Sequence, residues 1–199
     1  FFGEDAAASW QQETRPAVYL YNTREEYLAA TGQPAWSDGV SIQRLRVIYS
    51  FISAKDLADK VIAHELAHIM LKELVGFDNN ALPLWFEEGV ASVGENLDSR
   101  KIKAVLRKRA FSRRLIAQAE LNAMRALRGR TDKAALNRFY QQSYGLVDFL
   151  RNGPQGQRFP AFLRALRDGL DFEQALQLVY DIPGSAGLEK VWLDYLRQP

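Results

Sequence analysis

Short apolar runs near the start of the chain predict a small sheet. Residues 17–21 (AVYLY) and 45–49 (LRVIY) are rich in β-branched and aromatic residues, which are typical of strands. Between these runs, a T-R-E-E capping box predicts a helix that starts at Thr23 and stops at Gly32. The stretch 33–41, which contains a proline and a glycine, is predicted to be a loop.

The middle and the end of the chain have helical patterns. Ser53, followed three residues later by Asp56, forms a variant capping box that predicts the start of a helix, and Gly76 predicts its end. Pro83 suits the first turn of the next helix. Beyond Gly94, amphipathic patterns follow one another with short turns between them. The order of elements therefore predicts an α+β fold that is mostly helical, with a small N-terminal β-sheet and a C-terminal helical subdomain.

Length and composition fit one domain. The chain has 199 residues, of which 47% are apolar and 25% charged, values that are ordinary for a globular domain with one core. We expect a single domain over residues 1–199, made of a small sheet with its helix (1–52), a pair of helices (53–94) and a helical subdomain (95–199). No apolar run is long enough to cross a bilayer. The chain begins with Phe rather than Met, so we expect that the segment is trimmed.

The first chemical motif is H-E-L-A-H at residues 64–68, which contains both histidines of the chain. Residues at i and i+4 of a helix share a face, so His64 and His68 can reach a single ion. Glu65 projects beside that face, where it can contact a zinc-bound water without ligating the metal. The motif predicts a zinc site with Glu65 as a general base. The alternative is that both are ordinary helix histidines.

A second motif, L-P-L-W-F-E-E-G-V-A-S at residues 82–92, offers the missing ligand. A catalytic zinc is typically held by three side chains, and two histidines with one glutamate form a known set. The chain contains no cysteine, so histidine and carboxylate are the only strong ligand types it has. Glu88, or Glu87 beside it, could complete the set.

The two motifs together resemble those of gluzincin metallopeptidases, in which an HExxH helix precedes a helix whose glutamate ligand stands just before a glycine. Residues 85–91 (WFEEGVA) are similar to the W-L-N-E-G-x-A motif of aminopeptidase-N-like enzymes. Alignment on Glu-Gly selects Glu88 and leaves Glu87 in reserve, because the interval from His68 is one residue longer than is usual in that group. Thermolysin-like enzymes carry an aspartate one turn after the ligand; here Ser92 takes that place and could accept a histidine N–H.

A closer resemblance is to bacterial peptidase-MA-like domains, which pair HExxH with L-P-x-W-x-x-E-G-x-A. The segment Y-Q-Q-S-Y-G-L-V-D-F-L at residues 140–150 is similar to a later block of that group, and the resemblance extends over nearly the whole chain. It implies a zincin-like fold, a Zn²⁺ cofactor held by His64, His68 and Glu88, and an extracytoplasmic location. It also implies that the strand at 45–49 is the edge that pairs with an extended substrate.

Gluzincins often use a tyrosine from a later helix to hydrogen-bond the oxyanion. Tyr140 and Tyr144, four residues apart, are the candidates for this role by resemblance. The alternative for each is a ring packed in the core with its hydroxyl satisfied at the edge.

The resemblance implies a zinc-dependent metallopeptidase that acts on peptides or proteins. Endopeptidase activity is favoured, because no G-x-M-E-N segment for recognising a free amine precedes the zinc helix. One alternative is an inactive gluzincin-like module that binds peptides or regulates. Another is a metal-free helical interaction protein that contacts an acidic partner through the basic stretch 100–114. A nucleic-acid partner is not expected at a net charge of +2, and the sequence indicates no oligomeric state.

Overall fold

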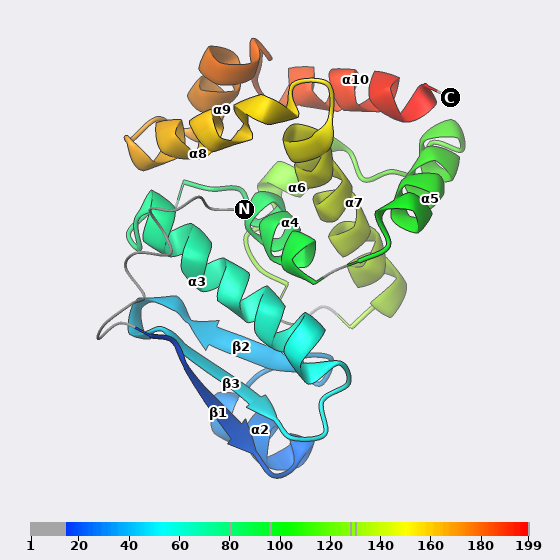
Figure 1. The fold of residues 1–199 in the computed structure, drawn as a ribbon. Helices are drawn as coiled ribbons and strands as arrows, with labels where there is room; N and C mark the ends of the chain where they lie inside the picture. The colour runs from blue at the N-terminus through cyan, green and yellow to red at the C-terminus, as the bar shows by residue number, and fades with distance from the viewer. Residues whose placement is uncertain (1–14, 80, 96, 128, 130, 199) are drawn as a thin grey trace.

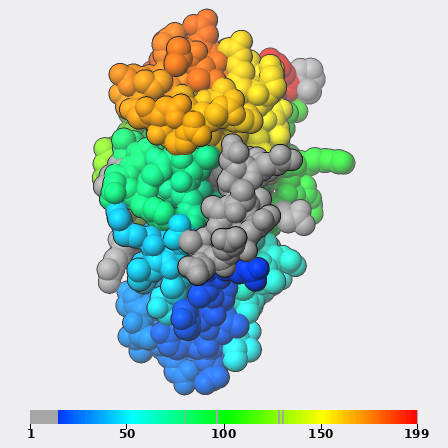
Figure 2. Space-filling view, turned by 60° about the vertical axis from the view of Figure 1, so that its left-hand side comes forward, coloured from blue at the N-terminus to red at the C-terminus, as the bar shows by residue number. Residues whose placement is uncertain are grey.

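The structure is a computed structural model that describes residues 15–79, 81–95, 97–127, 129 and 131–198. A small sheet with one short helix forms one end of the molecule, helix α3 crosses the middle, and the remaining helices form the other end (Figure 1). Figure 2 shows the same order from another side, with the early strands at the bottom and helices α8 and α9 at the top. The expected α+β class, mostly helical with a small sheet, is confirmed.

The sheet has three strands within the described residues: β1 (Ala17–Tyr21), β2 (Gly39–Ile42) and β3 (Val47–Phe51), in the order β1-β3-β2. β3 pairs in parallel with β1 and antiparallel with β2. Helix α2 (Arg24–Thr31) packs on one face through Tyr27, whose ring lies 5.7 Å from that of Phe51.

The first predicted strand and helix are confirmed. β1 has the predicted bounds, Thr23 caps α2 with a complete capping box, and Gly32 ends it in the left-handed region. The next strand is displaced by two residues from the prediction of 45–49. A 3₁₀ turn at Gln43–Leu45 and a left-handed Arg46 come first, so the chain becomes extended only from residue 47.

The loop prediction for 33–41 is partly wrong, because β2 begins at Gly39. The expectation that 45–49 forms the free edge is also wrong. β3 is paired on both sides, whereas β2 lies at the edge of the sheet. A period of two turns the Cα of Gly39 and the side chain of Ser41 toward the α3 face, and the side chain of Val40 toward the α2 face.

The helix that carries the H-E-L-A-H motif begins later than predicted. A π-helical turn, Leu57–Ile62 (η3), runs directly into α3 (Ala63–Val75). Ser53 does not cap it, and the backbone of Asp56 is left-handed at φ 54°. The Asp56 side chain makes no cap hydrogen bond to the backbone, and its carboxylate binds Lys60 at 2.5 Å. The end at Gly76 is confirmed.

The helical body packs around one large core. Its aromatic centre holds Phe86, Phe162 and Phe172, whose rings contact one another edge to face, an arrangement that adds to the stabilisation from burial. The elements of the body are α4 (Leu84–Gly94), α5 (Ser99–Phe111), α6 (Gln118–Ala123), α7 (Lys133–Asn152), η4 (Gly156–Arg158), α8 (Phe159–Arg167), α9 (Phe172–Ala175), η5 (Leu176–Tyr180) and α10 (Gly184–Arg197). In the part of the chain that the structure describes, none of these helices is long and apolar enough to cross a membrane.

Helices α4 and α7 meet at Gly89. A Cβ at this position would lie 2.4 Å from the backbone oxygen of Ser143 and 2.6 Å from a methyl of Val147. Only a residue without a side chain permits this approach. The glycine of the E-E-G motif therefore sets the distance between the two helices, one residue after Glu88.

Candidate metal centre

Helix α3 brings the two histidines together. His64 and His68 lie one turn apart, with their Nε2 atoms 3.2 Å from each other and their ring planes at 77°. Two imidazoles that lie one turn apart on a helix, with adjacent nitrogens, can share one ion. Other positions of the same helix, including Ile69 and Leu71, are buried in the interior, so packing fixes the face on which the histidines lie.

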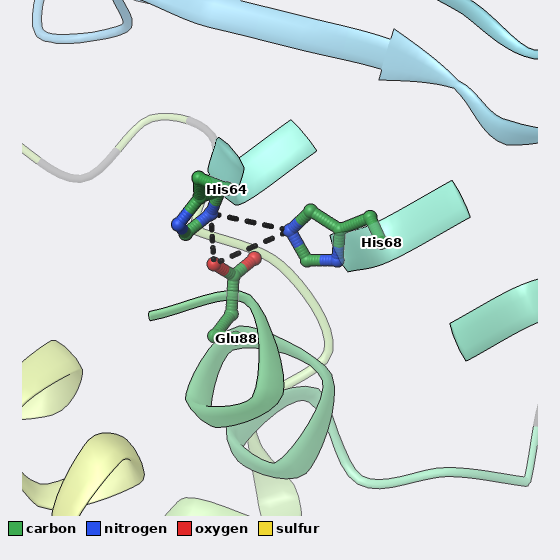
Figure 3. Close-up of side chains that lie close together, drawn as sticks. All are labelled: His64, His68 and Glu88. Atoms are coloured by element: carbon green, nitrogen blue, oxygen red, sulfur yellow. Dashed lines mark hydrogen bonds and ion pairs between the residues drawn. The ribbon is translucent and has the colours of Figure 1, made fainter. Parts of the chain in front are cut away.

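Helix α4 supplies the third group. Oε2 of Glu88 lies 3.4 Å from Nε2 of His64 and 3.8 Å from Nε2 of His68 (Figure 3). A tetrahedral zinc with bonds of about 2.0–2.1 Å separates its ligand atoms by roughly 3.3 Å, which is close to the separations of 3.2 and 3.4 Å and shorter than that of 3.8 Å. Among the described residues, this buried oxygen accepts no hydrogen bond, and such atoms are rare unless something else satisfies them. The three groups therefore fit a divalent ion such as Zn²⁺.

Glu87, the reserve ligand, points elsewhere. Its Oε1 receives a hydrogen bond from Nζ of Lys72 at 2.5 Å. Adjacent helical positions differ by about 100° in direction, so Glu87 and Glu88 face different neighbours. The structure brings Glu88 to the two histidines and leaves Glu87 in an ion pair.

Glu95, which sequence reasoning missed, binds the outer nitrogen of His64. Its Oε1 lies 2.7 Å from Nδ1, the contact that commonly fixes the orientation of a metal-binding histidine. Ser92, expected from the resemblance to accept this N–H, is buried and lines the cleft, but the partner that the structure shows at Nδ1 of His64 is Glu95. Glu95 lies seven residues after Glu88, two turns along the same helix face, and that spacing was the available signal.

Electrostatics couple these groups tightly. Burial alone would lower the pKa of His64, but the carboxylates of Glu88, Glu95 and Glu65 outweigh it and raise the pKa to about 10. Burial would raise the pKa of Glu88, and the two imidazoles outweigh that effect and lower it. In the metal-free protein, a proton on His64 thus compensates the carboxylates, and a divalent cation would replace that positive charge.

Glu65 lines the same cleft, which has a volume of about 870 Å³ and also contains the three candidate ligands. Glu65 follows His64 by one residue, which is about 100° around α3, so its carboxylate lies beside the ligands rather than among them. Oε2 of Glu65 accepts a hydrogen bond of 2.7 Å from the hydroxyl of Ser41 on β2. The base candidate is therefore held between α3 and the edge strand.

The structure separates the two candidate tyrosines. Tyr140 lines the cleft, its ring packs edge to face on His64 at 6.3 Å, and its hydroxyl interacts with the Glu88 carboxylate. Tyr144 is buried one turn further along α7, against Ser99 of α5. Four residues advance a helix by about 40° beyond a full turn, and α7 lies between α4 and α5, so the two rings reach different neighbours.

Burial and the nearby carboxylates, Glu88 first among them, raise the pKa of Tyr140 well above its usual range. Its hydroxyl therefore keeps its proton and can donate a hydrogen bond.

Comparison with known proteins gives one finding. A family model described as the Peptidase MA superfamily matches residues 4–198, almost the full length of the chain. The comparisons with curated proteins and with solved structures returned no match.

Proposed function

The chain belongs to the Peptidase MA superfamily, and on this premise we propose that it is a zinc-dependent metallopeptidase of the gluzincin type. The observation that carries the proposal is the cluster of His64, His68 and Glu88, whose ligand atoms all lie within 4.8 Å of one another. Glu65 shares their cleft. Three ligands of these types, with a carboxylate beside them that does not bind the metal, are the arrangement that hydrolytic zinc sites use.

In this proposal His64, His68 and Glu88 hold the zinc, which supplies Lewis acidity and lowers the pKa of water toward neutrality. Glu65 takes a proton from the attacking water and delivers it to the leaving amine. Glu95 holds the ring of His64 through Nδ1. No side chain becomes covalently attached to the substrate.

Tyr140 is the proposed donor to the oxyanion that forms when water attacks the peptide carbonyl. Its contact with Glu88 brings the phenol to the third ligand, and its raised pKa keeps the O–H intact. A preorganised donor at such a position typically contributes a factor of about 10²–10³ to turnover. Tyr144 has no part in this proposal.

For the substrate we propose an extended peptide that pairs with β2. This strand lies at the edge of the sheet, and Gly39, Val40 and Ser41 line the cleft. Main-chain pairing of this kind does not require a free terminus, which is consistent with an endopeptidase.

The test is digestion of a peptide library by the zinc-loaded protein beside a Glu65→Gln variant. Loss of the general base should lower turnover by roughly 10²–10⁴-fold, while the variant keeps about one zinc per chain, as the ligand set predicts. Glu88→Ala should lose the metal. Specific cuts made equally by wild type and Glu65→Gln would contradict the mechanism.

Two other outcomes would replace the proposal. Stoichiometric zinc without any cleavage would favour a peptide-binding module that retains the fold. No bound metal under zinc-replete conditions would favour the metal-free interaction protein.

A further inference from the structure

The edge strand makes a specific polar contact with the proposed base. The Ser41 hydroxyl on β2 donates to Oε2 of Glu65 at 2.7 Å, a normal length for an O–H···O bond to a charged acceptor. Ser41 is buried, so water competes little for this bond. The contact joins residues that are 24 positions apart in the chain and links the sheet to the zinc helix.

The backbone of β2 is pressed against the start of this helix. A Cβ at Gly39 would lie 2.5 Å from Cγ1 of Val61 and 3.3 Å from Cγ of Glu65. The absence of a side chain at Gly39 lets the strand approach closely. Two residues further on, the pleat directs Ser41 to the same face, where its short side chain reaches the carboxylate.

Ser41 has a single hydroxyl proton, and its neighbours favour donation of that proton to Glu65. Nε2 of Gln43 lies 3.4 Å from Oγ of Ser41 and can donate only toward it. Because Oγ serves Gln43 as an acceptor, its proton remains for the carboxylate. This hydrogen bond engages one oxygen of Glu65, and in the proposed mechanism the other accepts the proton from water.

We propose that Ser41 is a positioning residue for Glu65: its hydroxyl holds the carboxylate in the orientation that accepts a proton from water. This inference rests on the proposed function. A glutamate side chain has three rotatable bonds, and a misplacement of about 1 Å in a catalytic group can cost on the order of 10²-fold in rate. The same short strand would then carry both the edge for the substrate and the hydroxyl that fixes the base.

The kinetic test compares Ser41→Ala with Ser41→Thr in the zinc-loaded protein. Removal of the hydroxyl should lower kcat by roughly 10- to 100-fold and leave KM and zinc content unchanged. Threonine, which keeps the hydroxyl and suits a strand, should restore most of kcat. A merely structural role would instead lower stability without a selective loss in kcat.

Ser50→Ala is the matched control. Ser50 is a fully buried serine on β3 whose hydroxyl donates to the backbone oxygen of Asp38 at 2.7 Å. It lies on the same face of the sheet as Ser41 but does not line the cleft. This variant should lose some stability and keep kcat; an equal loss of kcat in Ser50→Ala and Ser41→Ala would overturn the inference.

A second readout does not depend on activity. Crystal structures of the zinc-loaded wild type and Ser41→Ala should show the Glu65 carboxylate in one orientation in the first and displaced or disordered in the second. An unmoved carboxylate in Ser41→Ala would overturn the inference even if the wild type is an active peptidase. A wild type without turnover would overturn the proposed function, and the two structures would still decide the role of Ser41.

Discussion

The sheet end and the helical body of the molecule are built in different ways, and the candidate metal centre lies between them. The cluster under the sheet has only three buried hydrophobic residues, Tyr27, Phe51 and Ala54, among the described ones. The body has a continuous core of aromatic and aliphatic side chains that extends from α3 to α10. Because α3 contacts both regions, its two histidines stand at their boundary.

The two regions support different residues of the candidate site. Glu88 and Tyr140 come from α4 and α7, two helices in van der Waals contact at Gly89. The contact that holds Glu65 comes from Ser41 on a short edge strand over the smaller cluster. Close helix packing therefore supports the candidate third ligand, and a short edge strand supports the candidate base.

The largest expected difference comes from one substitution made in each region. Phe86→Ala removes a fully buried ring that packs on three others, so it should cost about 4–5 kcal/mol of unfolding free energy and weaken zinc binding. Phe51→Ala removes a ring from the small cluster. It should cost about 3 kcal/mol of unfolding free energy, lower turnover and leave zinc binding unchanged. Denaturant unfolding and metal analysis check this pair. Equal losses of unfolding free energy in the two variants would show that the regions are equally packed.

Two glycine substitutions compare the contact between α4 and α7 with the contact between β2 and the start of α3. Gly89→Ala places a methyl against the backbone oxygen of Ser143, which cannot move without separating α4 from α7, so we expect a loss of about 1–3 kcal/mol. Gly39→Ala meets mainly the end of the Val61 side chain, which can rotate, and should cost less. Thermal unfolding of the two variants measures the order, and the reverse order would contradict this view of the two contacts.

Glu95→Gln tests the hydrogen bond that the helical body makes to His64. Replacement of the charged acceptor at Nδ1 should weaken zinc affinity by roughly 10- to 100-fold, because the ring loses its orientation and some basicity. Ser92→Ala, made at the position indicated by the resemblance, should leave the affinity almost unchanged. Chelator competition gives both values; a larger loss in Ser92→Ala would restore the serine to that role.

The smallest effect is the release of a proton. The pKa of His64 is raised from 6.5 to about 10 in the metal-free fold, so its charge stabilises that fold fully below pH 6.5 and the benefit is lost as pH rises toward 10. Zinc must displace this proton at pH 7, and uptake should release about one proton from His64. Calorimetry in buffers of different ionisation enthalpy counts it; no release would mean that His64 is already neutral.

The sequence predicted the elements that local rules determine. The capping box at Thr23, the β-branched and aromatic residues of β1 and the helical spacing of His64 and His68 are local features of the sequence, and the structure has the predicted helix start, strand and paired histidines. β2 escaped prediction because Gly39 and Ser41 are poor strand formers that pairing and packing against α3 force to be extended.

The missed parts of the candidate site depend on tertiary contacts. Nothing local distinguishes Tyr140 from Tyr144, since only the positions of α4 and α5 around α7 send one ring to the cleft and the other away. Glu95 was overlooked because the resemblance directs attention to Ser92, one turn earlier. The contact of Ser41 with Glu65 joins two segments through the fold, and no spacing in the sequence indicates it.

The ion pair between Lys72 and Glu87 holds a second carboxylate of α4 away from the histidines. Glu87 and Glu88 are neighbouring acids on α4, and they point about 100° apart around the helix axis. Lys72, one turn beyond His68, occupies one of them and is itself tied to the backbone oxygen of Asn79 at 2.8 Å. Lys72 thus neutralises the charge of Glu87 away from the histidines, and of these two acids only Glu88 faces them.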